Sequence, residues 1–378
     1  MILLLHRDLD PATRERLLTC LRREGLEGAL SRASSQEARM IEVDLPGPDP
    51  DLAARAALWP GVFKVVSEEA VAPLAARALD TIVVTPLRAT SPTVTVGPEN
   101  FVVVAGPCAV EDPETLATCA AAVRAAGVLL FRAGAYKPRT SPYSFQGLGR
   151  EGLVTLAHVA YDQGLAIVTE VLDPRDVDFV ASHAEILQLG ARSMQNYPLL
   201  REAGASKRPI LLKRGPAATL EEWIGAAEYC LEAGAASVIL CERGVRGFDP
   251  DRRNVLDLSV VPALKARCKM PVFVDPSHAT GRRALVPPMA KAAVVAGADG
   301  VMVEVHPEPQ HSRSDAAQAM SFGDFVPLLR DLEALARFEN RTFVRASPSV
   351  SRHDGNESAP PRPQGERSPR ASRGTPSR

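Results

Sequence analysis

Eight short apolar runs, separated by helical stretches, are the feature that most restricts the fold of this chain. The runs lack the alternation of polar and apolar residues that a half-exposed strand shows, and this is typical of strands buried on both faces of a parallel sheet. The stretches between them include 113–126 and 219–233, each followed by a glycine, Gly127 and Gly234, that can end a helix. The runs are residues 101–105, 128–131, 165–168, 186–189, 210–212, 238–240, 272–274 and 301–303.

The number and order of these runs predict a (β/α)8 barrel, the TIM barrel, over residues 86–345. Eight strands that alternate with helices over about 240 residues are the pattern of that fold. An open, doubly wound parallel sheet is the alternative. The number of units and the lack of a Gly-x-Gly-x-x-Gly motif after the first strand favour the barrel.

The first 85 residues predict a small α+β domain ahead of the barrel. Its elements follow in the order strand, helix, strand, strand, helix and strand, which is the ferredoxin-like pattern. The predicted strands are residues 2–5, 26–30, 40–45 and 62–66, and the predicted helices are residues 14–23 and 51–58.

Residues 346–378 differ in composition from the rest of the chain. They are rich in Ser, Pro, Gly and Arg, and Val350 is their only large apolar residue. Such a segment cannot bury enough apolar surface to offset its chain entropy, so we expect a disordered tail. Its arginines could bind an acidic partner, but a solvated tail is the simpler interpretation.

Composition argues against two classes of protein. The chain has 44 Lys and Arg against 45 Asp and Glu, so a net charge of −1 provides no global basic surface for nucleic acid. The apolar start ends at His6 and is too short for a secretory signal, and no run approaches the ~20 apolar residues of a membrane span. Six scattered cysteines without a Cys-x-x-Cys pair indicate reduced thiols, and we expect a cytoplasmic protein.

Charged or metal-binding residues follow every predicted strand of the barrel. A TIM barrel places its active site at these C-terminal strand ends, so the residues should meet at one mouth. Like charges gather only where anions offset them, and arginine suits phosphate and carboxylate, so the cations predict a polyanionic substrate or two phosphorylated ones. Single members could instead pair with Glu170, Glu242 or Asp275. The cations are Arg132, Lys137, Arg139, Arg192, Lys213 and Arg243.

A second group at the strand ends predicts a metal site. Cys108, His278, Glu304 and Asp315 offer a thiolate, an imidazole and two carboxylates, a mixed set that suits a divalent transition metal. Their wide spacing proves nothing by itself, because only a barrel mouth would bring them together. Taken alone, the cysteine is more often a buried thiol and the histidine could cap a loop. Two rival ligands lie nearby, His306 and His311.

Longer motifs surround these residues. The longest is Lys-Pro-Arg-Thr-Ser-Pro-Tyr-Ser-Phe-Gln-Gly-Leu-Gly at 137–149. The others are Ala-Gly-Pro-Cys at 105–108, Gly-Ala-Arg at 190–192, Leu-Leu-Lys-Arg-Gly at 211–215, Cys-Glu-Arg-Gly at 241–244, Asp-Pro-Ser-His at 275–278 and Val-Glu-Val-His-Pro at 303–307. Over roughly residues 90–340 the chain resembles the 3-deoxy-D-arabino-heptulosonate 7-phosphate (DAHP) synthases, and most closely their type I-beta branch.

The resemblance implies roles for the metal-site and cationic residues. The positions that match the family's ligands for a divalent metal are Cys108, His278, Glu304 and Asp315. The positions that match its phosphoenolpyruvate site are Arg132, Lys137, Arg192, Lys213 and Arg243. Because Lys137 would lie between the two substrates, it is our candidate for proton transfer.

The resemblance also implies a site for the second substrate. Arg139 and Thr140 match residues that hold the phosphate end of erythrose 4-phosphate, with Ser141 beside them. Glu170 matches a carboxylate beside phosphoenolpyruvate, and Asp275 matches one near the metal and the aldehyde.

The implied reaction joins phosphoenolpyruvate to erythrose 4-phosphate and yields DAHP and inorganic phosphate, the first step of the shikimate pathway to chorismate and the aromatic amino acids. The implied cofactor is a divalent metal, Mn²⁺ before Fe²⁺, Co²⁺ or Zn²⁺. The sister 3-deoxy-D-manno-octulosonate 8-phosphate (KDO8P) synthases use arabinose 5-phosphate and have Lys-Ala-Asn-Arg-Ser where this chain has Lys-Pro-Arg-Thr-Ser at 137–141. Some of them replace the metal cysteine by asparagine, whereas this chain has Cys108. A non-catalytic barrel that binds phosphorylated metabolites is a third interpretation.

The same resemblance implies a regulatory role for the first 85 residues. Several members of the type I-beta branch carry a ferredoxin-like domain that resembles a sensor closing over the active site when tyrosine or phenylalanine binds. We therefore expect an aromatic amino-acid effector, with a passive oligomer contact as the alternative. The family is typically homotetrameric, so we expect a homotetramer that binds neither nucleic acid nor membrane.

Overall fold

The computed structural model describes residues 2–6, 10–26, 40–44, 50–66, 72–139 and 141–346. The predicted tail at 346–378 lies outside these residues except for Ala346, and so does Thr140. Within the described part of the chain, no helix is both long enough and apolar enough to cross a lipid bilayer.

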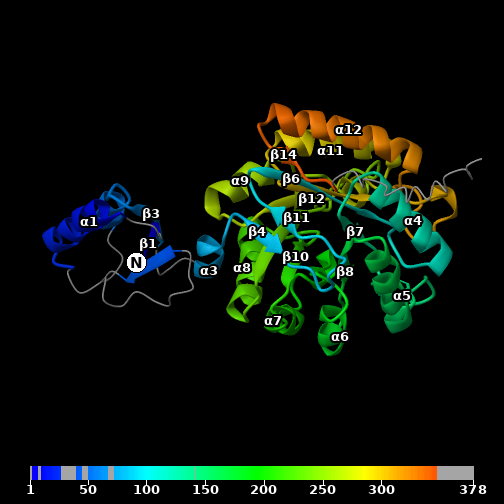
Figure 1. Cartoon of the computed structure of the whole chain (residues 1–378), viewed down its shortest axis with the longest axis horizontal. Coiled ribbons are helices and arrows are strands. Elements are labelled where there is room, and N and C mark those ends of the chain that lie inside the picture. The colour runs from blue at the N-terminus through cyan, green and yellow to red at the C-terminus, as the bar shows by residue number, and fades with distance from the viewer. Residues whose placement is uncertain are drawn as a thin grey trace, which may run out of the picture. The chain divides into compact units, whose positions relative to one another are not determined.

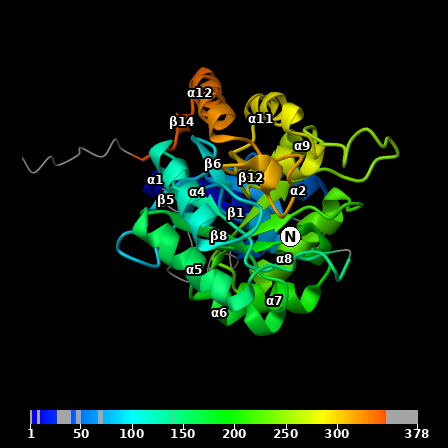
Figure 2. The same cartoon turned by 90° about the vertical axis from the view of Figure 1, so that its right-hand side faces the viewer.

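Eight parallel strands close into a barrel (Figures 1 and 2). They pair in chain order, and the last strand, β13, pairs with the first, β6, to complete the ring. Every residue of β8, β9 and β10 is buried, which explains why these runs show no polar alternation. All eight predicted strands are confirmed. They are β6 (Asn100–Gly106), β7 (Leu130–Arg132), β8 (Ala166–Glu170), β9 (Ile186–Leu189), β10 (Pro209–Lys213), β11 (Ser237–Glu242), β12 (Val272–Val274) and β13 (Gly300–Glu304).

Helices cover the outside of the strands, as Figures 1 and 2 show. Their starts follow from capping residues: the Asp112 carboxylate accepts from the Thr115 amide, and Thr219 forms a capping box with Glu222. The helices are α4 (Pro113–Ala125), α5 (Gly149–Asp162), α6 (Val177–Ala181), α7 (Tyr197–Ala205), α8 (Leu220–Glu232), α9 (Val260–Arg267), α10 (Pro276–Thr280), α11 (Val286–Val295) and α12 (Phe322–Phe338). Short 3₁₀ turns are η2 (Pro174–Asp176), η3 (Ala191–Ser193), η4 (Arg283–Leu285) and η5 (Pro309–His311).

An antiparallel hairpin, which the sequence did not predict, packs into the N-terminal end of the barrel. Its strands are β4 (Ile82–Val84) and β5 (Val94–Val96), and their buried side chains join the same core cluster as Val102, Leu130 and Phe273 inside the barrel. The predicted domain boundary at residue 85 falls in the turn segment of this hairpin. Three-residue strands are too short for periodicity to reveal them.

Two further short elements pack on the outside of the barrel. Helix α3 (Pro73–Arg77) lies on α8, where the Glu228 carboxylate accepts hydrogen bonds from the amides of Leu74 and Ala75. Strand β14 (Thr342–Phe343) follows α12 and pairs in parallel with the start of β6.

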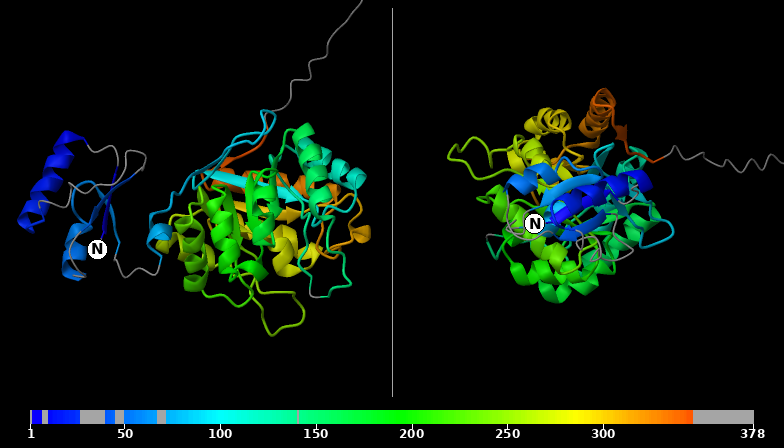
Figure 3. Two further views of the ribbon diagram at one scale, coloured as in Figure 1. Left: turned by 90° about the horizontal axis from the view of Figure 1, so that it is seen from below. Right: turned by 90° about the vertical axis from the view of Figure 1, so that its left-hand side faces the viewer.

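The N-terminal residues form a three-stranded antiparallel sheet with its own core. Strand β1 (Ile2–His6) lies between β2 (Met40–Asp44) and β3 (Val62–Val66). Figure 3 shows these strands with α1 (Pro11–Arg23) and α2 (Pro50–Ala56). The order and directions agree with three of the four strands of a ferredoxin-like domain. The remaining predicted strand, 26–30, lies outside the described residues except for Leu26. The core residues are Leu3, Leu5, Leu17, Leu21, Leu52 and Ala56.

Candidate active site

One cavity of about 310 Å³ lies at the C-terminal ends of the barrel strands. All six cations predicted from the sequence line it, together with Glu170, Ser141, His278 and Asp315. These residues are far apart in the sequence, but they lie close together because the barrel brings its strand ends to one mouth.

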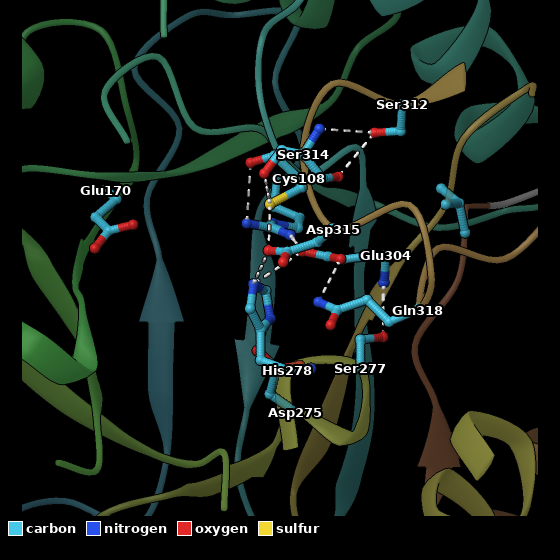
Figure 4. Close-up of polar contacts among 12 residues, drawn as sticks. Cys108, Glu170, Asp275, Ser277, His278, Glu304, Ser312, Ser314, Asp315 and Gln318 are labelled. Carbon is cyan, nitrogen blue, oxygen red and sulfur yellow. Dashed lines mark hydrogen bonds and ion pairs between the residues drawn. The ribbon is translucent and has the colours of Figure 1, made fainter. Parts of the chain in front are cut away.

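Four candidate metal ligands converge beside this cavity (Figure 4). One side-chain atom from each lies within 4.8 Å of the others. Cys108 follows β6, His278 lies on α10, Glu304 ends β13 and Asp315 follows η5. The Cys108 thiol donates to Asp315 Oδ2 at 3.2 Å, and His278 Nε2 lies 2.9 Å from Glu304 Oε1.

The rival histidines do not take part in this group. His306 is buried with its Nε2 3.6 Å from Glu111 Oε2, and its Nδ1 accepts from the Glu308 amide. His311 is exposed and contacts the Glu308 carboxylate at 2.8 Å. The tertiary structure therefore selects among the three candidate histidines, which the sequence left open.

Buried neighbours shift the pKa values of two of the four candidate ligands, Glu304 and His278. Burial opposes a charge on Glu304, but His278 and Arg132 hold the pKa of Glu304 well below its ordinary value. Burial also lowers the pKa of His278, but the carboxylates of Asp275 and Glu304 outweigh it and raise that pKa to about 10. A thiol, an imidazole and two carboxylates in this span are donors that a transition metal prefers.

Neighbouring residues hold the candidate ligands in place. The Asp275 carboxylate contacts His278 Nδ1 at 2.7 Å, so the ring presents Nε2 to the other ligands. Gln318 Nε2 donates to Glu304 Oε2 at 2.7 Å, and Ser277 Oγ accepts from the Glu304 amide at 3.1 Å. Such outer contacts orient metal ligands in proteins.

The cations of the cavity fall into two sets. Arg132 pairs with Glu304 at 2.7 Å, and Lys213 pairs with Asp275 at 2.6 Å. Among the residues that the structure describes, the other four have no carboxylate oxygen within 4.0 Å of their nitrogens. The alternative that some cations pair with Glu170, Glu242 or Asp275 is thus correct for Lys213 alone. Arg132 is also ion-paired, but with Glu304, which that alternative did not name, and the other cations leave positive charge at the cavity. These four are Lys137, Arg139, Arg192 and Arg243.

Glu170 lies in the cavity away from the metal ligands, as Figure 4 shows. Its carboxylate accepts from Gln188 Nε2 at 3.4 Å. The carboxylate occupies the space where a side chain at position 190 would lie, since a Cβ atom built on Gly190 would meet Glu170 Oε1 at 1.9 Å. Position 190 of the Gly-Ala-Arg motif is therefore glycine for a steric reason, because any side chain there would collide with Glu170.

Comparison with known proteins agrees with this geometry. A model of the DAHP synthetase I family matches residues 80–337, more than half of the 378-residue chain. A phospho-2-dehydro-3-deoxyheptonate aldolase from Thermotoga maritima is 47% identical over 243 residues, covering 64% of this chain and 72% of that protein. This chain belongs to the DAHP synthetase I family.

Solved structures and more distant relatives place the chain within that family. A crystal structure of the DAHP synthase from Thermotoga maritima has 36% sequence identity and a TM-score of 0.69, covering 90% of this chain and 98% of that chain. A truncated form of the enzyme from Thermotoga maritima has 43% identity and a TM-score of 0.63, covering 66% and 92%. The 2-dehydro-3-deoxyphosphooctonate aldolase of Nitratidesulfovibrio vulgaris is more distant, at 33% identity over 257 residues, 63% of this chain and 93% of that protein.

Membership in the DAHP synthetase I family makes the protein an enzyme that forms carbon–carbon bonds, a transferase of the DAHP synthase type. The family is metal-dependent, and this chain assembles a suitable set of ligands. The KDO8P alternative is the weaker one. It corresponds to the 2-dehydro-3-deoxyphosphooctonate aldolase of Nitratidesulfovibrio vulgaris, which is less similar to this chain in sequence than the Thermotoga enzyme is.

Sequence reasoning missed several polar residues of this DAHP synthase site. Arg253 lines the cavity and donates to Asp315 Oδ1 at 3.0 Å and to Gln318 Oε1 at 3.1 Å. Ser314 bonds to Cys108 and Gln188 bonds to Glu170. Arg253 lies in a charged segment between strand and helix, where no pattern separates it from ordinary surface. Ser314 could have been predicted from its place in the sequence, since it is the polar residue directly before the predicted ligand Asp315.

We predict that Gly190→Ala displaces the Glu170 carboxylate and lowers kcat/KM for the phosphoenolpyruvate substrate by about 10²-fold, the loss that a displacement near 1 Å can cause. The measurement is steady-state kinetics at saturating sugar phosphate. Gly225→Ala on α8 is the matched control, because a Cβ there meets nothing within 4 Å. Equal activity of the two variants would contradict the steric argument.

Proposed function

We propose that this enzyme condenses phosphoenolpyruvate with erythrose 4-phosphate at the barrel mouth, with a divalent metal held by Cys108, His278, Glu304 and Asp315. The observation that carries the proposal is a set of four cations that pair with no carboxylate in the described part of the chain, in the same cavity as two of the ligands, His278 and Asp315. Such a cavity suits two phosphorylated substrates beside a metal.

The cationic residues divide between the two substrates. We assign phosphoenolpyruvate to the cations at the ends of β7, β9, β10 and β11, and to Lys137. Arg139 and Ser141 lie in the segment after β7 and are assigned to the phosphate of erythrose 4-phosphate, as is Thr140. Arg139 Nε donates to the Phe145 carbonyl at 2.9 Å, which steadies the guanidinium at the cavity wall. The phosphoenolpyruvate set is Arg132, Lys137, Arg192, Lys213 and Arg243.

The chain's own residues position the chemistry. When bound, a divalent metal, for which we propose Mn²⁺, would supply a Lewis acid for the aldehyde oxygen. The phosphoenolpyruvate-binding cations hold the enol carbon toward the aldehyde carbon, where the new carbon–carbon bond forms. Glu170 is assigned to the positive charge that develops at carbon 2, where water adds and phosphate then leaves by cleavage of the C–O bond. Asp275 keeps His278 and Lys213 in place through contacts of 2.7 and 2.6 Å.

Lys137 is the residue that we assign to proton transfer. Its Nζ lies 3.0 Å from Cys108 Sγ and 3.0 Å from the Cys108 carbonyl oxygen, so it stands beside the ligand group. From there the ammonium group can give a proton to the aldehyde oxygen as that oxygen becomes an alkoxide.

We expect purified protein to release inorganic phosphate from phosphoenolpyruvate when erythrose 4-phosphate is added. EDTA should abolish the release and Mn²⁺ should restore it, because the proposed reaction needs the divalent metal that these four ligands would hold. The assay is colorimetric phosphate release, with arabinose 5-phosphate as the matched sugar. Release with arabinose 5-phosphate instead would move the chain to the KDO8P reaction, and silence with both sugars would refute the proposed reaction.

We predict that Lys137→Ala lowers kcat by about 10²–10⁴-fold, the range for loss of a general acid, while the protein still binds one metal ion. Turnover and bound Mn²⁺ would be measured on the same sample. Lys291→Ala on α11 is the control, since that side chain is half exposed and pairs with Asp331. A variant that turns over like the control would remove Lys137 from the mechanism.

We assign a regulatory role to the N-terminal sheet. We also propose that the enzyme is a cytoplasmic homotetramer. We propose that an aromatic amino acid, tyrosine or phenylalanine, binds this part of the chain and inhibits the barrel. Support comes from the core that the sheet forms by itself, separate from the core of the barrel. We also propose that the enzyme opens the route to chorismate, with no role for nucleic acid or membrane.

We expect deletion of residues 1–71 to leave synthase activity but to abolish inhibition by aromatic amino acids. The cut precedes α3 and β4, since both pack on the barrel and their loss would expose apolar side chains. Initial rates of the full chain and the truncated chain would be compared with each amino acid present. Identical inhibition of the two chains would make the N-terminal sheet a passive element.

A further inference from the structure

A chain of hydrogen bonds joins a substrate-binding cation to a metal ligand. Arg139 Nη2 donates to Ser314 Oγ at 2.7 Å, and Ser314 Oγ donates to Cys108 Sγ at 3.1 Å. Both Ser314 and Cys108 are almost fully buried, with 3% and 2% of their surface exposed. Figure 4 shows the serine directly beside the sulfur.

The direction of these bonds follows from the groups themselves. A guanidinium group can only donate, so the serine oxygen must accept from Arg139. The single hydroxyl proton is then available to the sulfur of Cys108. One hydroxyl group therefore touches a cation assigned to the sugar phosphate and a thiolate assigned to the metal.

The backbone around Ser314 is anchored independently of these two bonds. The Glu111 carboxylate accepts from Ser312 Oγ at 2.8 Å and from the Arg313 amide at 2.9 Å. Glu111 itself is buried and lies three residues after Cys108, so the segments that carry both ligands are tied together. Asp315 has a φ of 59°, a left-handed conformation that such anchoring helps to hold.

We propose that Ser314 is a positioning residue that couples binding of the sugar phosphate at Arg139 to the bond between the Cys108 thiolate and the metal. The proposal rests on the function assigned above to Arg139 and Cys108. It adds a polar link between the second substrate and the metal centre, through a residue that touches neither the reacting carbons nor the metal.

The physical basis is the polarisation of one hydrogen bond by another. A charged donor on the serine oxygen makes its hydroxyl a stronger donor to sulfur. A stronger hydrogen bond draws electron density from the thiolate and so weakens its donation to a metal. When a phosphate dianion binds Arg139, it competes with Ser314 for the guanidinium, and the hydroxyl becomes a weaker donor. The metal–sulfur bond then strengthens as the sugar phosphate arrives.

The test uses the full-length protein loaded with Co²⁺, because a thiolate bound to Co²⁺ gives a charge-transfer absorption band. The probe is glycerol 3-phosphate, which has a phosphate ester but no aldehyde to bind the metal directly. In the unmodified protein the probe should move the band to longer wavelength. Ser314→Ala should move the band in the same direction without the probe, and the probe should then have no effect.

Three matched variants separate coupling from a merely structural role. Ser314→Thr keeps the hydroxyl and should restore both the band position and the response. Arg139→Met leaves the serine in place but should shift the band and lose the response. Ser206→Ala removes a hydroxyl outside the cavity, one that donates to the Ala203 carbonyl at the end of α7, and should behave like the unmodified protein.

The outcomes distinguish this proposal from the proposed function. A band and a probe response in Ser314→Ala equal to those of the unmodified protein would overturn the coupling alone. So would a full response in Arg139→Met. The absence of any charge-transfer band in the unmodified protein would remove Cys108 from the metal site, and the proposed function would fall together with the coupling.

Discussion

Two buried carboxylates, Asp275 and Glu304, hold the mouth of the barrel together. Each pairs with one cation, Lys213 and Arg132, and the ring of His278 lies between them with one nitrogen facing each. Breaking a buried pair by removing one partner leaves an unpaired charge and costs about 3–5 kcal/mol. The positions of side chains at the C-terminal ends of four strands, β7, β10, β12 and β13, thus depend on one another through these two acids.

Closure of the barrel makes that arrangement possible. Strand β13 pairs with β6 so that Glu304 lies opposite Gly106, and this places the segment that carries Cys108 beside the last strand. Cys108 and Asp315 are 207 residues apart in the chain, yet their side chains are hydrogen-bonded. The hairpin of β4 and β5 fills the opposite end of the barrel with apolar side chains. Apolar packing therefore occupies one end, and the other end is free to be polar.

The balance of charge at the mouth connects structure to function. Two cations, Arg132 and Lys213, pair with acids that also contact His278, so these pairs fix the site and the protein itself offsets part of their charge. Four others keep their charge for ligands. Burial, only partly offset by Asp275, lowers the pKa of Arg243, whose guanidinium donates to the carbonyls of Gly244 and His278 rather than to a carboxylate. A phosphorylated substrate that supplies the missing negative charge is thereby favoured.

The sequence by itself determined the eight strands and the residues at their ends, because buried parallel strands and charged strand ends leave local patterns. It offered four candidate ligands as well, but left two rival histidines, His306 and His311, beside them. It also predicted the N-terminal order of elements, of which three strands are described. Only the tertiary structure decided that Arg132 and Lys213 are paired while Arg139 is not, that His278 rather than His306 faces the cysteine, and that Ser314 and Arg253 complete the site. Those outcomes depend on contacts between residues far apart in the chain. The distances and directions of such contacts are set when the barrel closes, so the periodicity of the sequence does not predict them.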